Sequence, residues 1–279
     1  MEENTSKTYD DEDDAGACFL LALNMSKDFS STRYCQLIRS HIADGFCASL
    51  MRELAPVLGR DEWRRAQAEI ELAKKHSISV IHLFDPGYPP ELYAIADPPL
   101  VIFVRGALPA APRVGIVGTR RCTGYGRQIA SFFSREHTRR GGCIVSGLAF
   151  GIDAAAHRGA VEGAPAAAGG SGSAGIAVLG SGVMNPAPAA NCALAAEVLQ
   201  ARGALISEYG VSTQSRAYFF PRRNRIISAL SNAVVIVEAA EKSGSLITAR
   251  LALEQGREVC AVPGPVDSLT SAGPNKLIK

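Results

Sequence analysis

Three arginines stand at the predicted start of a helix, within residues 219–230, FFPRRNRIISAL. Pro221 is typical of a first helical position, and the apolar residues after it recur at helical spacing. The first turn would therefore hold Arg222, Arg223 and Arg225. That end of a helix carries about half an elementary positive charge, so cations there are unfavourable by roughly 0.3–1 kcal/mol unless an anion joins them. The pattern predicts an anionic partner.

Two aromatic residues, Phe219 and Phe220, precede these arginines. Aromatic faces beside a cationic groove hold single-stranded nucleic acids, at about 1–3 kcal/mol per stacked base. Packing in the core is the alternative for either phenylalanine. The stretch 219–225 is thus compatible with a phosphate-bearing partner whose bases are unpaired.

The elements that must position these residues form a regular series. Strand-like apolar runs alternate with helical patterns along 113–264: RVGIVG, CIVSG, GIAVLGSG, ALISEYG, AVVIVEAA and REVCAVPG. Buried Val/Ile runs separated by helices indicate a parallel sheet covered on both faces. We therefore expect an α/β fold with a Rossmann-like, doubly wound, mostly parallel sheet.

Ligands of such sheets bind outside the carboxyl ends of the strands. Glycine and serine dominate those ends here, in GTRR at 118–121, SG at 146–147, GSG at 180–182, SEYG at 207–210 and KSGS at 242–245. Such residues let backbone N–H groups approach an anion closely, with helix N-termini behind them. The series predicts a phosphate-binding edge.

Carboxylates near this edge lack a convincing catalytic partner. They are Asp153, Glu208 and Glu238, and Asp153 is also placed to cap the helix that contains His157. In that Ala-rich helix His157 is expected to pack rather than to act as a base. Ser243 and Ser245 are likewise placed to cap a helix. A binding surface is favoured over an enzyme.

Charge is unevenly distributed along the 279 residues, whose formal net charge is +2. Residues 1–14 hold seven acids and one lysine, whereas residues from 111 onward hold 18 basic and 10 acidic side chains, only three of the basic ones being lysine. The planar guanidinium fork suits phosphate, although a solvated basic face is the alternative.

Composition excludes several other classes of protein. The seven cysteines are scattered and unpaired, so neither a disulfide framework nor a metal site is indicated, and no cofactor is expected. No apolar run reaches the roughly 20 residues that cross a bilayer, and the N-terminus is acidic rather than a basic secretion signal. The sequence predicts a cytoplasmic protein without a membrane span.

Three segments follow one another along the chain. Residues 1–14 form an acidic leader with the composition of a disordered segment. Helical patterns at 19–23, 34–42, 46–57 and 63–73 predict a small helical domain over 15–75. Residues 76–279 form the Rossmann-like domain, interrupted by a Gly/Ala/Ser-rich insertion at 162–175 that is expected to be a linker, with a moving lid as the alternative.

The order of motifs resembles that of the DprA/Smf family of DNA-processing proteins. The resemblance runs over roughly 76–279 and includes VGIVGTR, SGLAFGIDAAAHRGA, FPRRNRIISALS and EKSGSLITARLALEQG. It implies an extended Rossmann fold that binds single-stranded DNA without catalysis, forms homodimers and loads the RecA recombinase onto incoming DNA in natural transformation. It also implies a sterile-alpha-motif-like (SAM-like) N-terminal domain before residue 75.

Together, the strand ends and the resemblance predict one set of DNA-binding residues. These are Arg120, Arg121, Ser146, Gly147, Gly151, Asp153, Phe220, Pro221, Arg222, Arg223, Asn224, Arg225, Lys242, Ser243, Gly244, Ser245 and Thr248. The anion required by the three arginines would then be a DNA backbone.

The chain departs from the family pattern at four places. Phe150 stands where the motif SGLARGID has arginine, and Ala187 and Ala190 replace the tyrosine and glutamate of a YPPEN-like motif. Pro274 replaces a threonine, and the sequence ends at Lys279 without the winged-helix domain of many members. Two alternatives therefore stay open: a dimeric scaffold that has lost DNA binding, and a nucleotide-processing hydrolase similar to the phosphoribohydrolases. The phosphoribohydrolases carry a PGGxGTxxE motif with a catalytic glutamate. The corresponding stretch here, EKSGSLITA, lacks a glutamate at that spacing, which argues against the hydrolase.

Overall fold

The computed structural model describes residues 7–26, 58–165 and 173–279. The chain divides into two compact units, Met1–Phe103 and Val104–Lys279. The helical patterns predicted at 34–42 and 46–57 lie outside the described residues, as does the middle of the predicted 162–175 insertion.

The first unit contains the helices α1 (Lys7–Met25), α4 (Arg60–Lys75) and α5 (Pro90–Tyr93) and the strand β1 (Ser79–His82). Helices α1 and α4 pack together, and the rings of Phe19 and Trp63 lie 6.1 Å apart. Helix α1 begins inside the segment 1–14 for which composition predicts disorder. The unit also extends past the predicted boundary at residue 75, because residues 76–103 bury apolar side chains such as Leu92 and Leu100 within it. Strand β2 (Val101–Gly106) runs across the boundary.

The second unit has the predicted doubly wound architecture. Its strands are β3 (Arg113–Val117), β4 (Cys143–Ser146), β5 (Ile176–Val178), β6 (Ala204–Ser207), β7 (Ala233–Ile236) and β8 (Glu258–Ala261). They lie in the order β6-β5-β4-β3-β7-β8, and every neighbouring pair is parallel. The α/β fold class predicted from the alternating runs is confirmed.

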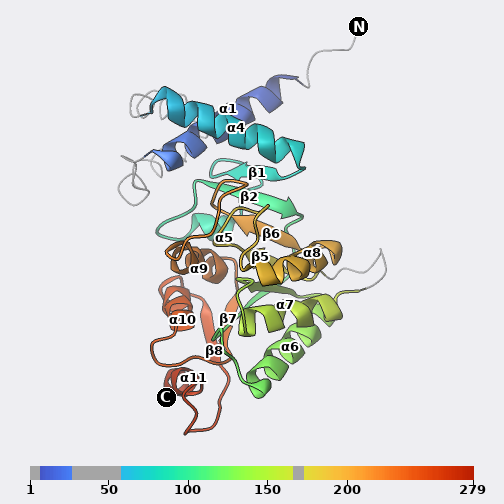
Figure 1. The fold of residues 1–279 in the computed structure, drawn as a ribbon, viewed down its shortest axis with the longest axis vertical. Coiled ribbons are helices and arrows are strands. Elements are labelled where there is room, and N and C mark those ends of the chain that lie inside the picture. Colours follow the sequence, from blue (N-terminus) through green and yellow to red (C-terminus); the bar gives the residue numbers. More distant parts are fainter. Residues whose placement is uncertain (1–6, 27–57, 166–172) are drawn as a thin grey trace. The chain divides into compact units, whose positions relative to one another are not determined.

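Helices cover both faces of this sheet (Figure 1). They are α6 (Gly124–Arg139), α7 (Ile152–Gly163), α8 (Cys192–Gln200), α9 (Phe219–Ala229), α10 (Gly244–Glu254) and α11 (Ala272–Ile278), with the short 3-10 helix η2 (Ala189–Asn191) before α8. Helices α6 and α7 pack on each other, and so do α9 and α10. Because both faces are covered, every residue of β4, β5 and β6 is buried.

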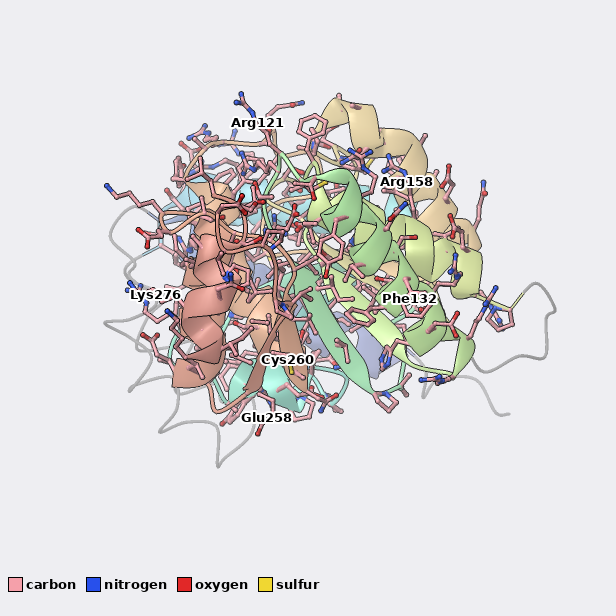
Figure 2. The ribbon with its side chains drawn as sticks, turned by 90° about the horizontal axis from the view of Figure 1, so that it is seen from below. Arg121, Phe132, Arg158, Glu258, Cys260 and Lys276 are labelled. Atoms are coloured by element: carbon pink, nitrogen blue, oxygen red, sulfur yellow. The ribbon has the colours of Figure 1, made fainter. Side chains whose placement is uncertain are left out.

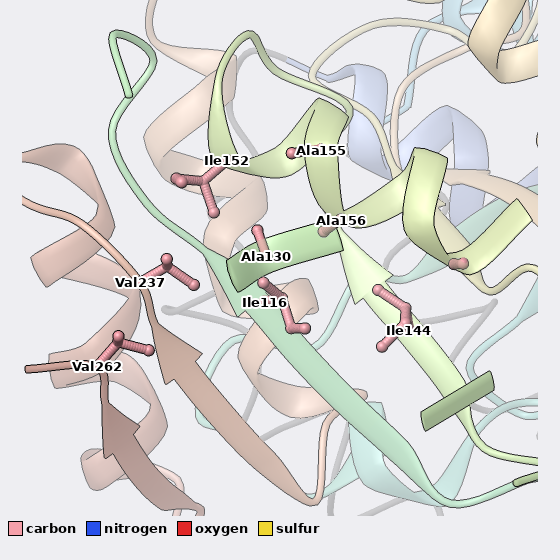
Figure 3. Packing of buried hydrophobic residues seen from close by; sticks show 9 residues of the cluster. Ile116, Ala130, Ile144, Ile152, Ala155, Ala156, Val237 and Val262 are labelled. Atoms are coloured by element: carbon pink, nitrogen blue, oxygen red, sulfur yellow. The ribbon is translucent and has the colours of Figure 1, made fainter. Parts of the chain in front are cut away.

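An apolar core holds α6 and α7 against the sheet (Figure 3). Ile116 of β3 and Ile144 of β4 pack with Ile152, Ala155 and Ala156 of α7, and Ala130 of α6 belongs to the same cluster. The small alanine side chains let α7 lie close to the sheet. None of the described helices combines the length and the apolar composition that a membrane span requires.

The order in which strands are added to the sheet reverses at β3. Strands β4, β5 and β6 follow on one side of β3, whereas β7 and β8 lie on its other side. Loops that leave neighbouring strands toward opposite faces open a crevice at such a reversal. The loops after β3, β4 and β7 are therefore the ones that the fold brings together at this crevice.

Candidate functional site

A cleft of about 480 Å³ lies at this reversal, and we call it the edge cleft. Its walls come from the loop after β3, the turn between β4 and α7, the start of α9 and the start of α10. From the predicted set it is lined by Arg120, Arg121, Asp153, Phe220, Pro221, Arg223, Asn224, Ser243, Gly244, Ser245 and Thr248. Residues separated by up to 128 positions in the sequence thus meet at one place, because the strand order puts their loops side by side.

A buried guanidinium group, that of Arg223, forms part of the cleft lining. Arg223 is only 3% exposed, and its Nη1 donates a hydrogen bond of 2.9 Å to the carbonyl oxygen of Val178. The guanidinium lies directly over Gly147, where any Cβ would overlap its atoms. Burial lowers the pKa of Arg223 to about 10, so the group stays charged at neutral pH. Its Nε–H has no hydrogen-bond partner in the described part of the chain.

Asp153 lies in the first turn of α7 but does not cap that helix, contrary to the interpretation from spacing. Its Oδ2 accepts a 3.1 Å hydrogen bond from the backbone N–H of Gly147, which ties the turn back to the end of β4. The residue before α7 is Gly151, whose φ of 75° favours glycine. Burial raises the pKa of Asp153, and the positive charge of Arg223 opposes that rise.

The two phenylalanines have different roles. Phe219 is buried and stacks on Tyr209, with ring centroids 3.8 Å apart. Phe220 lines the cleft, close to Gly180, where a Cβ would come within 3.1 Å of its ring. The Arg120 guanidinium carbon lies 5.1 Å from the Phe220 centroid. Of the two rings, Phe219 therefore packs in the core and Phe220 lines the cleft.

Helix α10 contributes its N-terminus to the cleft. Ser243 caps the helix as predicted, accepting a 3.4 Å hydrogen bond from the N–H of Ser245, and the two hydroxyl oxygens are 2.8 Å apart. Gly244 leaves open space, since a Cβ there would meet no atom within 4 Å. Backbone N–H groups at this helix end are therefore accessible to an anion in the cleft.

Arg225 differs from the prediction, because it is occupied inside the protein. Its Nη1 and Nη2 donate hydrogen bonds of 2.8 and 2.6 Å to the two carboxylate oxygens of Glu208, and both side chains are buried. Helix α9 begins at Phe219, so Pro221 is its third residue and the arginines follow the first turn. Arg222 is 45% exposed in its side chain and lies 3.9 Å from Glu208, outside the cleft lining. The three arginines therefore do not form one cationic group.

Other predicted residues lie beside the cleft rather than in it. Ser146 is fully buried, and its hydroxyl donates a 2.7 Å hydrogen bond to the carbonyl oxygen of Ile116. Gly147 and Gly151 shape the turn after β4, while Lys242 is exposed beyond the cleft lining. His157 is fully buried as expected, and burial lowers its pKa to about 4, so it is neutral at physiological pH.

Glu238 is used to organise the loop after β3. Its carboxylate accepts hydrogen bonds from the backbone N–H of Thr123 at 2.9 Å and from the Thr123 hydroxyl at 2.5 Å. Thr123 in turn caps α6. A carboxylate of the protein therefore already occupies the N-terminal region of α6, whereas the N-terminus of α10 faces the cleft.

Sequence reasoning missed the positioning role of Asn191 and two cationic residues near the cleft. Asn191 is buried, and its Nδ2 donates hydrogen bonds to the carbonyl oxygens of Leu148 and Ala149, at 2.8 and 3.2 Å, which fixes the turn before α7. Arg127 and Arg158 line a second hollow next to the cleft. They belong to different helices, and no local pattern connects them.

The parallel sheet and the arginine-lined cleft at its edge define a doubly wound α/β protein with a cationic cleft. Residues 79–279 match the model of the family described as DNA recombination-mediator protein A. The chain belongs to this family, in agreement with the resemblance seen in its motifs.

Individual relatives show the same relationship. The chain is 46% identical over 194 residues to protein Smf of Escherichia coli, a match that covers 69% of this chain and 50% of that protein. It is 41% identical over 209 residues to the DNA processing protein DprA of Bacillus subtilis, covering 74% of this chain and 67% of that protein. The chain thus spans about half the length of the E. coli relative.

Two solved structures extend the likeness to the fold. The crystal structure of DNA processing protein A from Streptococcus pneumoniae superposes with a TM-score of 0.77 at 30% identity, covering 94% of this chain and 92% of that one. The Helicobacter pylori protein, whose structure was described for its single-stranded DNA binding mode, gives a TM-score of 0.62 at 29% identity, covering 72% and 86%.

Proposed function

We propose that the protein binds single-stranded DNA in the edge cleft and acts as a mediator that loads RecA recombinase onto it during natural transformation. The buried Arg223 carries the proposal. Its charge forms no ion pair within the described chain, and its Nε–H is unpartnered at a cleft wall. A buried guanidinium group with an unpartnered N–H and no ion pair is unfavourable, and an anionic ligand such as a phosphodiester offsets that cost.

In this proposal the strand contacts four parts of the cleft. The exposed Arg120 and Arg121 and the buried Arg223 neutralise phosphates, and the open N-terminus of α10 at Gly244 adds backbone donors. A base stacks on Phe220 by replacing the Arg120 guanidinium that now lies over the ring. Arg225 contributes indirectly, because its pair with Glu208 holds α9 in place.

We propose binding rather than catalysis. Glu208 is engaged by Arg225 and Glu238 by Thr123, so both carboxylates already have internal tasks. Asp153, which lines the cleft, accepts a hydrogen bond from the N–H of Gly147. A hydrolase needs a positioned base or nucleophile, and each of these three carboxylates is instead engaged in hydrogen bonds within the protein. Release of free base from nucleoside monophosphates would revive the hydrolase alternative.

The mediator role is supported by the family's description and by the relatives named DNA processing protein. A protein with this role would work in the cytoplasm, where incoming DNA meets the recombinase. The likeness to a protein described for its single-stranded DNA binding mode supports the choice of ligand. A strand held by its phosphates, with one base stacked, leaves most bases free to pair.

We also propose a homodimer formed through the β8 edge of the sheet. An apolar groove of about 870 Å³ lies there, between α6 and the last two strands, with Ile129, Phe132, Val235 and Val262 in its lining. Figure 2 shows Phe132 and Cys260 of this groove. An open parallel edge beside apolar surface favours a second copy of the chain as partner. Sedimentation of a monomer at micromolar concentration would contradict this assembly.

The decisive experiment is a titration of a fluorescent oligothymidylate against a matched duplex over a range of salt concentrations. We expect tighter binding of the single strand, because duplex bases present no free face to Phe220. Arg120→Gln/Arg121→Gln removes two phosphate contacts and should reduce the slope of log affinity against log salt by about 1.4. Arg139→Gln/Arg250→Gln is the matched control, since these exposed arginines pair with Glu136 and Glu254 away from the cleft lining.

Equal affinity of the two double variants would refute the assignment of the edge cleft. If the protein is dimeric but binds neither oligonucleotide, the alternative of a dimeric scaffold that has lost DNA binding is favoured.

A further inference from the structure

A second hollow, of about 700 Å³, adjoins the edge cleft. Four arginines are among the residues that line it, Arg120, Arg121, Arg127 and Arg158, and we call it the arginine groove. The first two also line the edge cleft, so the two hollows meet at the loop after β3. Figure 2 shows Arg121 on that loop and Arg158 on α7.

The two additional arginines are held by a rigid pair of helices. Arg127 lies in the first turns of α6 and Arg158 in the middle of α7. The backbones of these helices approach closely because Gly159 and Gly163 lie against the backbone of Ser131 and Arg135, where any Cβ would clash. The spacing of Arg127 and Arg158 is therefore set by backbone packing rather than by flexible loops.

The lining of the groove carries an excess of positive charge. No acidic residue belongs to its lining, and Arg121, Arg127 and Arg158 form no ion pair within the described chain. Farther along α6, Arg135 lies 3.5 Å from Glu162. Glu162 lines a neighbouring hollow that also includes Arg127 and Arg158, but the ion pair that it forms is with Arg135. Clustered like charges repel one another, so a polyanion is the ligand that their arrangement favours.

An exposed aromatic ring stands in the wall of this groove. Phe150 is 48% exposed, in the place where the family motif has arginine. The bonds from Asn191 to Leu148 and Ala149 fix the turn that carries it. A solvent-facing ring among arginines gives an unpaired base a surface for stacking, whereas a duplex offers no such base.

We propose that the arginine groove carries the same DNA strand onward from the edge cleft, with Arg127 and Arg158 on its phosphates and Phe150 under a base. This inference rests on the proposed function, since it requires a strand in the edge cleft. Arg120 and Arg121 lie where the two hollows meet, so the strand passes over them. The site is then two adjoining segments, each with an aromatic ring and its own arginines.

Oligonucleotide length separates the two segments. A thymidylate of about 6 nucleotides fills the edge cleft, whereas one of about 20 nucleotides reaches both hollows. We expect Arg127→Gln/Arg158→Gln to bind the short oligomer like the wild type and to lower the salt slope for the long one by about 1.4. Phe150→Leu should weaken the long oligomer by about 5-fold or more and leave the short one unchanged. Arg139→Gln/Arg250→Gln again serves as the charge-matched control.

The possible results are distinguishable. Failure of the wild type to bind either oligomer overturns the proposed function, and this inference with it. Normal binding by the wild type, with the same long-oligomer affinity and salt slope in Arg127→Gln/Arg158→Gln, overturns only the second segment. Equal weakening of both oligomers by that variant also overturns it, because the arginines would then act on the edge cleft through their general field. Since both side chains are exposed, circular dichroism should show that the variants are folded.

Discussion

Arg222 and Arg225 are three residues apart, yet their replacement should change different properties. Replacing Arg225 should lower the stability of the fold, and replacing Arg222 should weaken DNA binding. Arg225 is 9% and Glu208 4% exposed in their side chains, and two charge-assisted hydrogen bonds join them. Removing one partner of a buried pair leaves the other charge uncompensated, at about 3–5 kcal/mol. Since domains have only about 5–15 kcal/mol of stability, Arg225→Met should remove a large part of the free energy of unfolding. Arg222→Ala changes an exposed side chain and should stay within about 0.5 kcal/mol.

Urea unfolding followed by circular dichroism measures both effects. The single tryptophan, Trp63, reports only on the first unit, so backbone ellipticity is the better signal for the second. Glu208→Met should destabilise to a similar extent. The double variant Arg225→Met/Glu208→Met should regain most of the loss, because an apolar pair of similar volume can replace a buried ion pair.

DNA binding supplies the second half of this test. Under conditions where Arg225→Met stays folded, its salt slope should equal that of the wild type. Arg222→Ala should lower the slope by the share of one phosphate at the rim of the cleft, about 0.7. A stable Arg225→Met protein with a reduced salt slope would refute the reasoning. It would mean that Arg225 leaves Glu208 and contacts the phosphates itself.

Three further outcomes follow from the contacts. Because burial lowers the pKa of His157 from 6.5 to about 4, the unfolded chain binds this proton more tightly, and about 3 kcal/mol of stability should disappear as pH falls through that window. His157→Met should lose this contribution, and identical pH dependence of the urea midpoint in both proteins would contradict it. Gly151→Ala combines a φ of 75° with a Cβ only 2.7 Å from the carbonyl oxygen of Arg120, so it should cost about 2 kcal/mol or more, whereas Gly244→Ala meets open space and should cost less than about 0.5 kcal/mol. An equal effect of the two alanines on thermal unfolding would exclude this explanation. Phe220→Leu should weaken oligothymidylate binding by about 5-fold or more while Phe220→Tyr retains it, and anisotropy that detects no loss in the leucine variant would remove Phe220 from the site.

Much of the architecture could be predicted from local patterns. Buried Val/Ile runs of strand length can be satisfied only in a sheet covered on both faces, so RVGIV, CIVS and AVVI predict β3, β4 and β7 directly. Glycine and serine after these strands likewise predict a ligand edge. Most of the predicted residues line one cleft because strand ends converge in every doubly wound sheet.

Charge pairing could not be predicted in the same way. The arginines of 222–225 look equivalent as a sequence, but α9 turns Arg223 toward Gly147 and the cleft, and Arg225 toward Glu208. A helix rotates about 100° per residue, so adjacent side chains enter different environments. The carboxylate that pairs with Arg225, that of Glu208, follows strand β6, and the local pattern of α9 does not indicate it.

The sequence by itself determined the fold class, the family and the edge at which a ligand would bind, because hydrophobic periodicity and glycine chemistry are local properties. Only the tertiary structure decided that Arg225 is held internally, that Phe220 rather than Phe219 faces the cleft, and that Arg127 and Arg158 share a groove. Those facts depend on distances between segments far apart in the chain. Packing fixes such distances, and no single segment encodes them.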